Sequence, residues 1–255
     1  MPHWQLWIRY DGSRYHGWQV QPNGVTVQQT LQDAVERLTG TRSGITGCSR
    51  TDAGVHAKQF CCALHTGCAI PTDRVPDALN AHLPRDIAVM ACRAVGEDFH
   101  PRYDAVGKRY VYRILNAPTR DPFLEGRAYH IRRRLNVDVM AKAAADLTGK
   151  HDFAAFCAAG STVEDTVRTV RDCGVTRRGE LVEIHMQADG FLYNMVRIAV
   201  GTLLEIESGR LPGNAVPAIL ASGDRALAGA TAPAEGLYLE RVFYPDGSGL
   251  NLETE

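Results

Sequence analysis

The sequence lacks a long apolar run. No stretch within its 255 residues approaches the roughly 18 apolar residues that can span a bilayer. Residues 1–7 also lack the basic and apolar regions of a secretory signal peptide. We therefore expect a cytoplasmic protein that is not bound to a membrane. The length is sufficient for one large domain or two modest ones, each with a core of its own.

The cysteine content does not fit a disulfide framework. Seven cysteines, an odd number, in a chain without a secretory signal indicate reduced thiols. Cys62, His65 and Cys68 follow one another at intervals of three residues, with Cys61 adjacent, and this pattern suggests a zinc site. Residues 59–66 are rich in strand-forming types, however, and residues three apart on a strand point to opposite faces. We therefore expect that Cys62 and His65 do not share a metal, and we assign no metal and no cofactor.

The chain also lacks an excess of positive charge. Its formal net charge of −1 would by itself argue against a nucleic-acid partner, because phosphate binding needs a local positive potential. The basic residues are clustered, however, whereas the acidic residues are spread out or lie in the tail 253–255. Each cluster fits either a basic groove or a solvated face, and for residues 132–134 neither interpretation is favoured. The clusters are Lys108, Arg109 and Arg113; Arg132–Arg134; and Arg168, Arg171, Arg177 and Arg178.

The first half of the chain alternates between strand and helix patterns. Apolar residues at every second position from Trp4 to Tyr10, followed by Asp11-Gly12, predict a half-buried strand that enters a turn. Apolar residues at helical spacing from Val27 to Leu38, followed by Gly40, predict an amphipathic helix with a glycine stop. The other expected elements are a strand at 59–66, a helix at 72–81 and a strand at 87–95.

The pattern begins again at Lys108. Alternating Tyr110, Tyr112 and Ile114 predict a strand, and the turn residues 177–179 between alternating apolar runs predict a hairpin. This order of elements favours an α+β fold on a largely antiparallel sheet. We also expect a helix at 137–147, a long helix after Gly190 and a last strand at 237–243. The predicted division is a first half at 1–104, a second half at 105–245 and an acidic tail at 246–255.

The most informative motif is the octet RTDAGVHA at residues 50–57. A nearby cation and backbone N–H donors both favour the ionised form of a carboxylate, and Asp52 follows Arg50 by two residues. Asp52 could therefore act as a nucleophile or a base at neutral pH. Gly54 allows a positive φ or a close approach to a ligand. The same residues would also fit a surface ion pair, which contributes little energy.

A single charge interrupts an apolar segment in the second half. Arg197 is the one charged residue between Phe191 and Leu204, and at about 100° per residue it falls nearly opposite the apolar stripe of the expected helix. An uncompensated buried charge is strongly destabilising, so we expect a carboxylate partner, with Asp52 as the candidate. A guanidinium that reaches water or bonds a helix end is the alternative. The stripe consists of Leu192, Met195, Val196, Ala199 and Leu203.

The octet resembles the signature around the catalytic aspartate of the tRNA pseudouridine synthase A family. Five further stretches resemble motifs of the same family, in the same order, over nearly the whole chain. The departures are substitutions by small residues, such as Ala154-Ala155 where serines are usual. The five stretches are YDGSRYHGWQVQP from Tyr10, KRYVYRI from Lys108, HDFAAF from His151, GFLYNMVRIAVGTLLEI from Gly190 and APAEGLYLERVFY from Ala232.

This resemblance implies a fold and an activity. The implied fold is the pseudouridine synthase fold, in which two related α/β halves share a largely antiparallel sheet with a central active-site cleft. The implied enzyme is an isomerase that converts uridine to pseudouridine at positions 38, 39 and 40 in the anticodon stem-loop of tRNAs, without a cofactor. The family also implies a homodimer whose partner is tRNA.

The resemblance implies roles for single residues as well. Asp52 matches the catalytic carboxylate, Arg50 the arginine that helps to displace and replace the flipped nucleotide, and Arg197 the expected cation of the site. Tyr110, and not Tyr112, matches the tyrosine that packs against the target base. A tyrosine flanked by basic residues fits base stacking, although a strand tyrosine is more often part of a core. Plausible contacts to the RNA backbone are Arg168 and Arg171.

Two other functions are compatible with parts of the sequence. A catalytically silent tRNA-binding protein would keep the basic residues but would not need Asp52. A glycosidase would need two carboxylates about 5 Å or about 6.5 to 9.5 Å apart, and no second acid stands in a comparable motif. An assay that separates free uracil from pseudouridine distinguishes the three functions. The sequence leaves open whether Asp52 adds covalently to the substrate or abstracts a proton to give a glycal.

Overall fold

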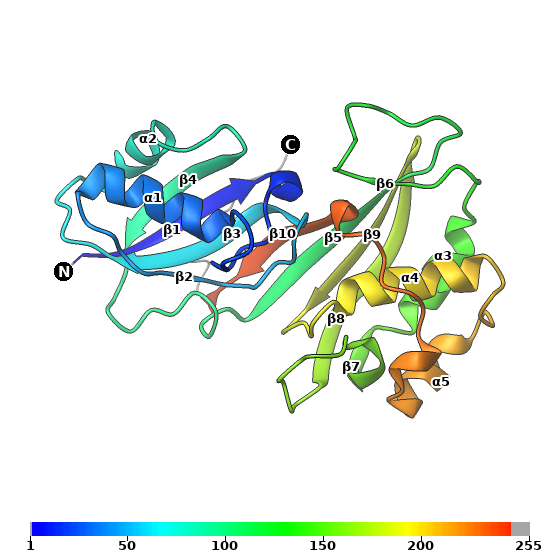
Figure 1. Ribbon diagram of the computed structural model, residues 1–255. Coiled ribbons are helices and arrows are strands. Elements are labelled where there is room, and N and C mark those ends of the chain that lie inside the picture. The colour runs from blue at the N-terminus through cyan, green and yellow to red at the C-terminus, as the bar shows by residue number, and fades with distance from the viewer. Residues whose placement is uncertain (1, 246–255) are drawn as a thin grey trace. The chain divides into compact units, whose positions relative to one another are not determined.

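A computed structural model describes residues 2–245, in two compact units (Figure 1). Of the described residues, the first unit consists of 2–106 and 238–245, and the second of Gly107–Leu237. The acidic tail predicted at 246–255 lies outside the described residues. Within residues 2–245, no helix combines the length and the apolar character that crossing a membrane requires.

The sheet of the first unit is built around one central strand. β1 (His3–Tyr10) pairs antiparallel with β3 (His56–His65) on one side and with β4 (Ile87–Ala94) on the other. The short β2 (Ile45–Gly47) also pairs antiparallel with β3. The strands predicted at 59–66 and 87–95 are therefore confirmed.

The last strand of the chain returns to this sheet. β10 (Leu237–Phe243) pairs in parallel with β3, and Tyr238 lies opposite His56. The sequence predicts this strand correctly but places it in the second half, whereas from Tyr238 on it belongs to the first unit. A parallel pairing joins strands that are far apart in the chain, so no local pattern could have indicated its position.

β1 is a strand, as predicted, but the expectation that it is half-buried is wrong. His3, Gln5 and Trp7, on the face that was expected to be exposed, are all buried. Gln5 donates its side-chain amide to Cys61 Sγ at 3.3 Å and accepts a hydrogen bond from Arg93 Nε. A polar side chain can lie inside a protein when it is hydrogen-bonded in this way, so alternating polarity did not report exposure here.

Two helices complete the first unit. α1 (Val27–Thr39) begins at Thr26, whose side-chain oxygen accepts the N–H of Gln29, and ends at Gly40 with φ of 73°. Both the helix and its glycine stop are confirmed, because a left-handed residue after the last turn favours glycine. The predicted helix at 72–81 is present as the shorter α2 (Val75–Asn80), which packs beside β4.

The sheet of the second unit is antiparallel apart from one short strand. Its long hairpin turns at Gly179, which has φ of 61°, and this confirms the hairpin predicted at 177–179. The alternating tyrosines predicted as a strand form its first strand. In order across the sheet the strands are β5 (Gly107–Leu115), β9 (Leu181–Ala188), β8 (Val167–Arg178) and β7 (Gly149–Asp152), and β6 (Tyr129–His130) pairs in parallel with β5.

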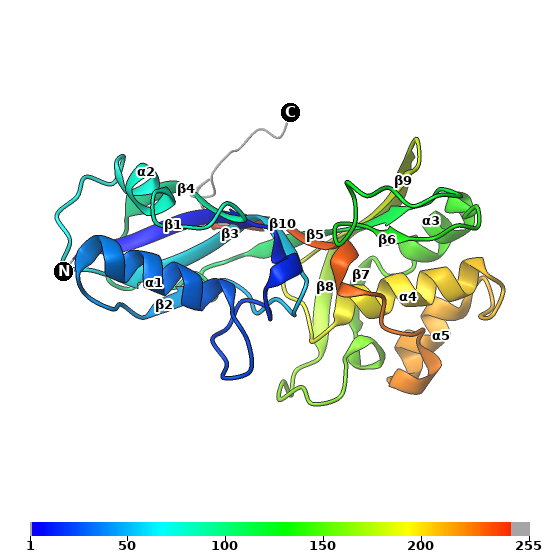
Figure 2. The same ribbon diagram turned by 45° about the horizontal axis from the view of Figure 1, so that its top comes forward.

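Helices α3 (Val137–Ala145), α4 (Met195–Glu207) and α5 (Ala215–Ser222) accompany this sheet (Figures 1 and 2). α3 packs against β8 and α4, and α4 also contacts β5. The helix predicted at 137–147 is confirmed. Single 3₁₀ turns occur at η1 (Gly12–Arg14), η2 (Ala154–Phe156), η3 (Arg225–Leu227) and η4 (Ala234–Gly236). The protein thus has a mixed α+β fold with mostly antiparallel strand pairs, as the sequence predicts.

Candidate functional site

Asp52 lies on the short loop between β2 and β3 in the first unit. Its side chain is half-buried, and its backbone carbonyl accepts the N–H of Val55 at 3.2 Å. Gly54, at the tip of this turn, has φ of 80°, which confirms that the octet needs a residue able to adopt the left-handed conformation. Arg50 is exposed at the start of the same loop.

The turn after β1 holds this loop in place. The N–H of Trp18 donates to the carbonyl of Thr51 at 3.1 Å, and the N–H of Gly54 donates to the carbonyl of Tyr15 at 3.2 Å. The hydroxyl groups of Tyr10 and Thr51 lie 2.9 Å apart and share a buried hydrogen bond. Asp52 is therefore flanked on both sides by residues that are tied to residues 10–18. The backbone on both sides of this carboxylate is thus held in a fixed position.

Two glycines allow the turn to approach so closely. A Cβ at Gly12 would overlap with the carbonyl oxygen of Val55, and one at Gly17 would overlap with that of Thr51. Gly17 also has φ of 82°, a conformation that side chains disfavour. From the sequence alone we matched this stretch to a family motif but assigned it no role. Its role is to form one wall of the Asp52 loop.

His56 connects the loop to two further segments. Its Nδ1 accepts the backbone N–H of Gly12 at 3.0 Å, and its ring stacks on that of Tyr238 with centroids 4.5 Å apart. The same Nδ1 lies 3.2 Å from Asp11 Oδ1. Sequence reasoning missed His56, although its place inside the octet was a signal.

The two tyrosines of β5 have different surroundings in the second unit. Tyr110 is 6% exposed, lies opposite Met186 on β9 and meets the ring of Phe191 edge-on, with centroids 4.9 Å apart. Tyr112 is fully buried and donates its hydroxyl to the carbonyl of Pro233 at 2.7 Å, and its burial raises the pKa of its phenol well above the usual value. Tyr112 thus has a structural role. Tyr110 is also buried, and its contact with a base stays a prediction.

Arg197 bonds the start of its own helix. Its Nη1 donates to Asn194 Oδ1 at 2.8 Å, and Asn194 precedes α4 with φ of 59°. Its Nε donates to the carbonyl of Ala232 at 2.7 Å. The sequence left two possibilities, a carboxylate partner or a helix end, and the contact with the helix end is present. A pairing with Asp52 would join the two units and stays a prediction.

The segment 229–232 packs against the side of α4 that lies opposite the predicted apolar stripe. The N–H of Ala232 donates to the carbonyl of Arg197 at 3.1 Å, and a Cβ at Gly201 would overlap with the carbonyl oxygen of Ala230. The N–H of Gly229 donates to Thr202 Oγ1 at 2.9 Å. The long helix predicted after Gly190 is confirmed, and it begins at Met195. All residues of the predicted apolar stripe are buried, but α4 is buried nearly all round, because Ile198, Val200 and Gly201 outside the stripe are buried as well. Close packing of backbone against Gly201 has no signature in helical periodicity.

Several basic residues proposed as an RNA groove are engaged within the second unit. Arg113 Nε pairs with Glu183 at 2.9 Å, directly across the β5–β9 ladder. Arg109 Nη1 lies 3.4 Å from Asp172 Oδ2. Arg168 Nη1 donates to the carbonyl of Asp165 at 2.9 Å, so its side chain folds onto its own turn. These pairings favour the solvated-face interpretation for this part of the charge pattern.

The side chains of Cys62 and His65 differ in burial, as expected for residues three apart on a strand. Cys62 is fully buried on β3, whereas the side chain of His65 is exposed at the end of that strand. Among residues 2–245, no three His, Cys, Asp or Glu side chains come together in a way that could hold a metal ion.

Comparisons with known proteins agree on one family. A family model described as tRNA pseudouridine synthase matches residues 7–104 and 143–245. A tRNA pseudouridine synthase A of Moorella thermoacetica is 49% identical over 246 residues, which cover 96% of this chain and 100% of that protein. One of Acetivibrio thermocellus is 46% identical over 240 residues, which cover 94% and 98%. The chain therefore belongs to the tRNA pseudouridine synthase family, whose members are isomerases that convert uridine to pseudouridine in tRNA.

Proposed function

We propose that this isomerase modifies the uridines at positions 38, 39 and 40 in the anticodon stem-loop of tRNAs, and that Asp52 is its catalytic carboxylate. The observation that carries the assignment of Asp52 is the way its loop is held. Backbone hydrogen bonds from residues 10–18 hold both sides of Asp52, and two glycines allow that close approach. Such a fixed position is what a carboxylate needs if it is to meet one atom of a substrate.

The reaction places a defined demand on this carboxylate. The N1–C1′ bond of uridine must break, the uracil must rotate, and C5 must bond to C1′. The proton released from C5 replaces the bond lost at N1, so atoms and electrons balance without an oxidant, a reductant or a cofactor. Asp52 can contribute either by adding covalently to the sugar or base, or by taking the C2′ proton to give a glycal. Both routes need an ionised carboxylate at a fixed position.

The other proposed site residues help to expose and confine the base. A target base must leave its stack at a cost of about a few kcal/mol before it can react. Arg50, exposed on the Asp52 loop, is suited to fill the place that the base leaves. Tyr110 would pack against the flipped base, supported from its side by Phe191. Arg197 would supply positive charge to the carboxylate while the helix start holds its guanidinium.

The setting of this activity is proposed from the family resemblance. We place the enzyme in the cytoplasm, as a homodimer that binds tRNA. A catalytically silent tRNA-binding protein is the alternative function. The backbone bonds around Asp52 argue against it, because binding to phosphates alone does not need a fixed carboxylate.

Mapping of pseudouridine in tRNA tests the proposed positions. The tRNA of cells that lack this protein should carry uridine at positions 38, 39 and 40, and pseudouridine should return there when the protein is supplied again. Pseudouridine that returns only at other positions would contradict the proposed substrate site. No return at any position, with intact tRNA binding, would support the silent protein instead.

A further inference from the structure

A strongly basic loop projects from the second unit. Residues 116–135, which we name the arginine loop, run from the end of β5 through β6 to the start of α3 and stand above β6 in Figure 1. The loop carries five arginines against two acids, although the whole chain has a net charge of −1. All five are exposed: Arg120, Arg127, Arg132, Arg133 and Arg134.

The base of the arginine loop is fastened by one buried amide. Asn116 donates through Nδ2 to the carbonyls of Ile131 at 2.8 Å and Arg133 at 2.6 Å. Its Oδ1 accepts the N–H of Leu135 at 3.0 Å and Nη2 of Arg177 at 2.7 Å. All four hydrogen bonds that this side chain can make are formed, so the two ends of the loop are held together.

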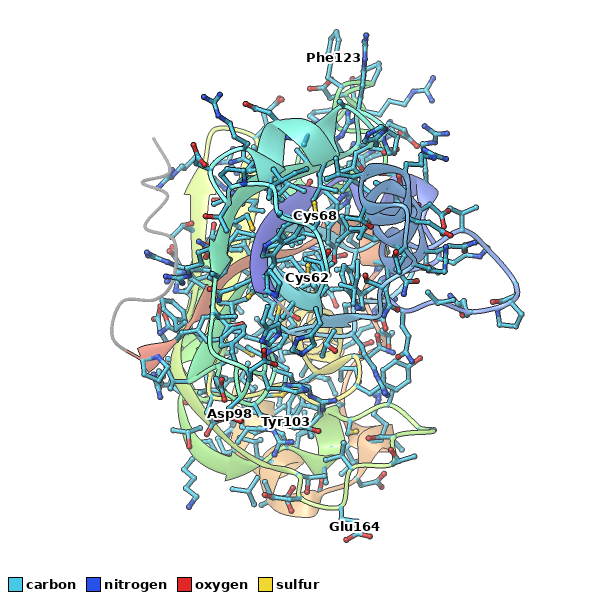
Figure 3. The ribbon with its side chains drawn as sticks, turned by 90° about the vertical axis from the view of Figure 1, so that its left-hand side faces the viewer. Cys62, Cys68, Asp98, Tyr103, Phe123 and Glu164 are labelled. Atoms are coloured by element: carbon cyan, nitrogen blue, oxygen red, sulfur yellow. The ribbon has the colours of Figure 1, made fainter. Side chains whose placement is uncertain are left out.

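The tip of the loop is also held by contacts within the loop. Asp121 Oδ1 accepts the N–H of Phe123 at 2.9 Å, and Leu124 packs against a small apolar cluster formed by Leu115, Ala117 and Ala128. Phe123 nevertheless points away from the second unit, with 85% of its surface exposed, and it is labelled in Figure 3. The turn therefore holds a phenyl ring in water, where it gains nothing from burial.

Arginine side chains are arranged beside this ring and along the loop. Arg127 Nη1 donates to the carbonyl of Phe123 at 3.3 Å, and Arg132 Nε donates to the carbonyl of Pro118 at 3.2 Å. Arg133 pairs with Glu207 of α4, so it serves to attach the loop. Within the loop, Phe123 is the one large apolar side chain that is exposed, so the loop itself does not present a contiguous patch of large apolar side chains.

We propose that the arginine loop is a second contact for tRNA, in which Phe123 stacks on an unpaired base and the neighbouring arginines bind phosphates. An exposed aromatic ring among exposed arginines is suited to bind RNA. The ring can stack on the π face of a base, and the arginines can bind the negative charge that each nucleotide carries. The proposal rests on the tRNA substrate of the proposed function. The loop starts after Leu115, about 17 Å along β5 from Tyr110 at strand spacing. It thus contacts tRNA away from the nucleotide that Tyr110 meets.

The test compares Phe123→Ala and an Arg120→Ala/Arg134→Ala double variant with the wild type on full-length tRNA. Leu227→Ala and Arg210→Ala are matched controls, because these side chains are also exposed in the second unit. Phe123→Ala should raise KM roughly tenfold, as expected for the loss of one stacked base, with kcat unchanged. The double variant should also raise KM, and it should reduce the slope of log affinity against log salt by about one per lost phosphate contact.

Two results would overturn the proposal that the arginine loop contacts tRNA. Unchanged KM and salt slope in both variants would overturn it. A lower mass of Phe123→Ala in sedimentation, relative to the wild type, would overturn it as well and would assign the loop to contact between copies of the chain. Mapping the modified positions in the same reactions keeps the two proposals separate. Pseudouridine outside positions 38–40 would contradict the proposed function, while the KM comparison would still test the loop.

Discussion

His56 Nδ1 accepts the backbone N–H of Gly12 at 3.0 Å, so the residue that ends the Asp52 loop is bonded to the turn that forms the wall of this loop. His56 is only 2% exposed, and its ring also stacks on Tyr238. We therefore infer that His56 is a positioning residue, which holds Asp52 through this loop.

Two substitutions separate the hydrogen bond from the stacking of His56. His56→Asn keeps an acceptor near Nδ1 and should retain most of kcat, whereas His56→Phe keeps a ring against Tyr238 and loses the acceptor. We expect His56→Phe to lower kcat at least tenfold per folded molecule, since small displacements of a catalytic group cost about that much or more, with KM for tRNA unchanged. His65→Asn, at the exposed end of the same strand, is the control. Equal kcat in both His56 variants would contradict the positioning role.

The close approach at Gly17 predicts a local effect on stability. Gly17→Ala places a Cβ against the carbonyl of Thr51 at a residue with φ of 82°. We expect a loss of about 2 kcal/mol in the free energy of unfolding, from overpacking and an unfavourable φ together. Gly44→Ala is the control, because a Cβ there meets no atom within 4 Å. Urea denaturation measures both variants, and similar midpoints would show that the turn can move away from the loop.

Buried thiols predict a loss of stability at alkaline pH. Burial raises the pKa of Cys92 and of Cys173 to about 12, from an ordinary value of 9.0. Above pH 9 the unfolded chain therefore loses protons that the folded chain keeps, so stability present below pH 9 should fall as pH rises toward 12. Thermal unfolding between pH 7 and pH 11 should show a decreasing Tm above pH 9, and Cys173→Ala should reduce the decrease. A Tm that is constant over this range would contradict the prediction.

Arg197→Met should affect both folding and catalysis. Arg197 donates to Asn194 and to Ala232, and both acceptors would lose this partner in the variant. We expect a loss of about 1–3 kcal/mol in unfolding free energy. We also expect a lower kcat per folded molecule, which Arg197→Lys does not restore, because an ammonium cannot reproduce a two-pronged hold on a carboxylate.

A second variant distinguishes the two roles of Arg197. Asn194→Gly removes only the partner at the helix start, and glycine tolerates the φ of 59° at this position. It should lower stability and leave kcat nearly intact. If Arg197→Met has the same kcat as Asn194→Gly after correction for the folded fraction, Arg197 has only a structural role.

Local signals in the sequence were sufficient for most elements. Gly40 and Gly179 adopt the positive φ that their positions after a helix and in a hairpin require. Alternation from Tyr110 to Ile114 marks a strand whose Tyr110, Tyr112 and Ile114 side chains are all buried. These features depend on residues that are close together in the chain, so a pattern in the sequence is sufficient to predict them.

Contacts between distant segments were not predictable in the same way. The cover of segment 229–232 over α4 makes that helix buried nearly all round, and the bond from Gly12 to His56 joins residues 44 positions apart. A glycine that admits a neighbouring carbonyl looks the same in sequence as one in a flexible turn. Asp52 could be proposed from the sequence because its motif is local, whereas the turn that holds its loop became apparent only in the structure.

The central claim is that Asp52 performs the chemistry, and a single-turnover assay of Asp52→Asn tests it most directly. Excess enzyme is mixed with tRNA, and pseudouridine, free uracil and tRNA affinity are measured together. Asp33→Asn is the control, because Asp33 is a half-buried carboxylate of the same unit that pairs with Arg42. We predict no pseudouridine and no free uracil with Asp52→Asn, and an affinity within about tenfold of the wild type, since phosphate contacts dominate binding. Pseudouridine formation by Asp52→Asn near the wild-type rate would contradict the account.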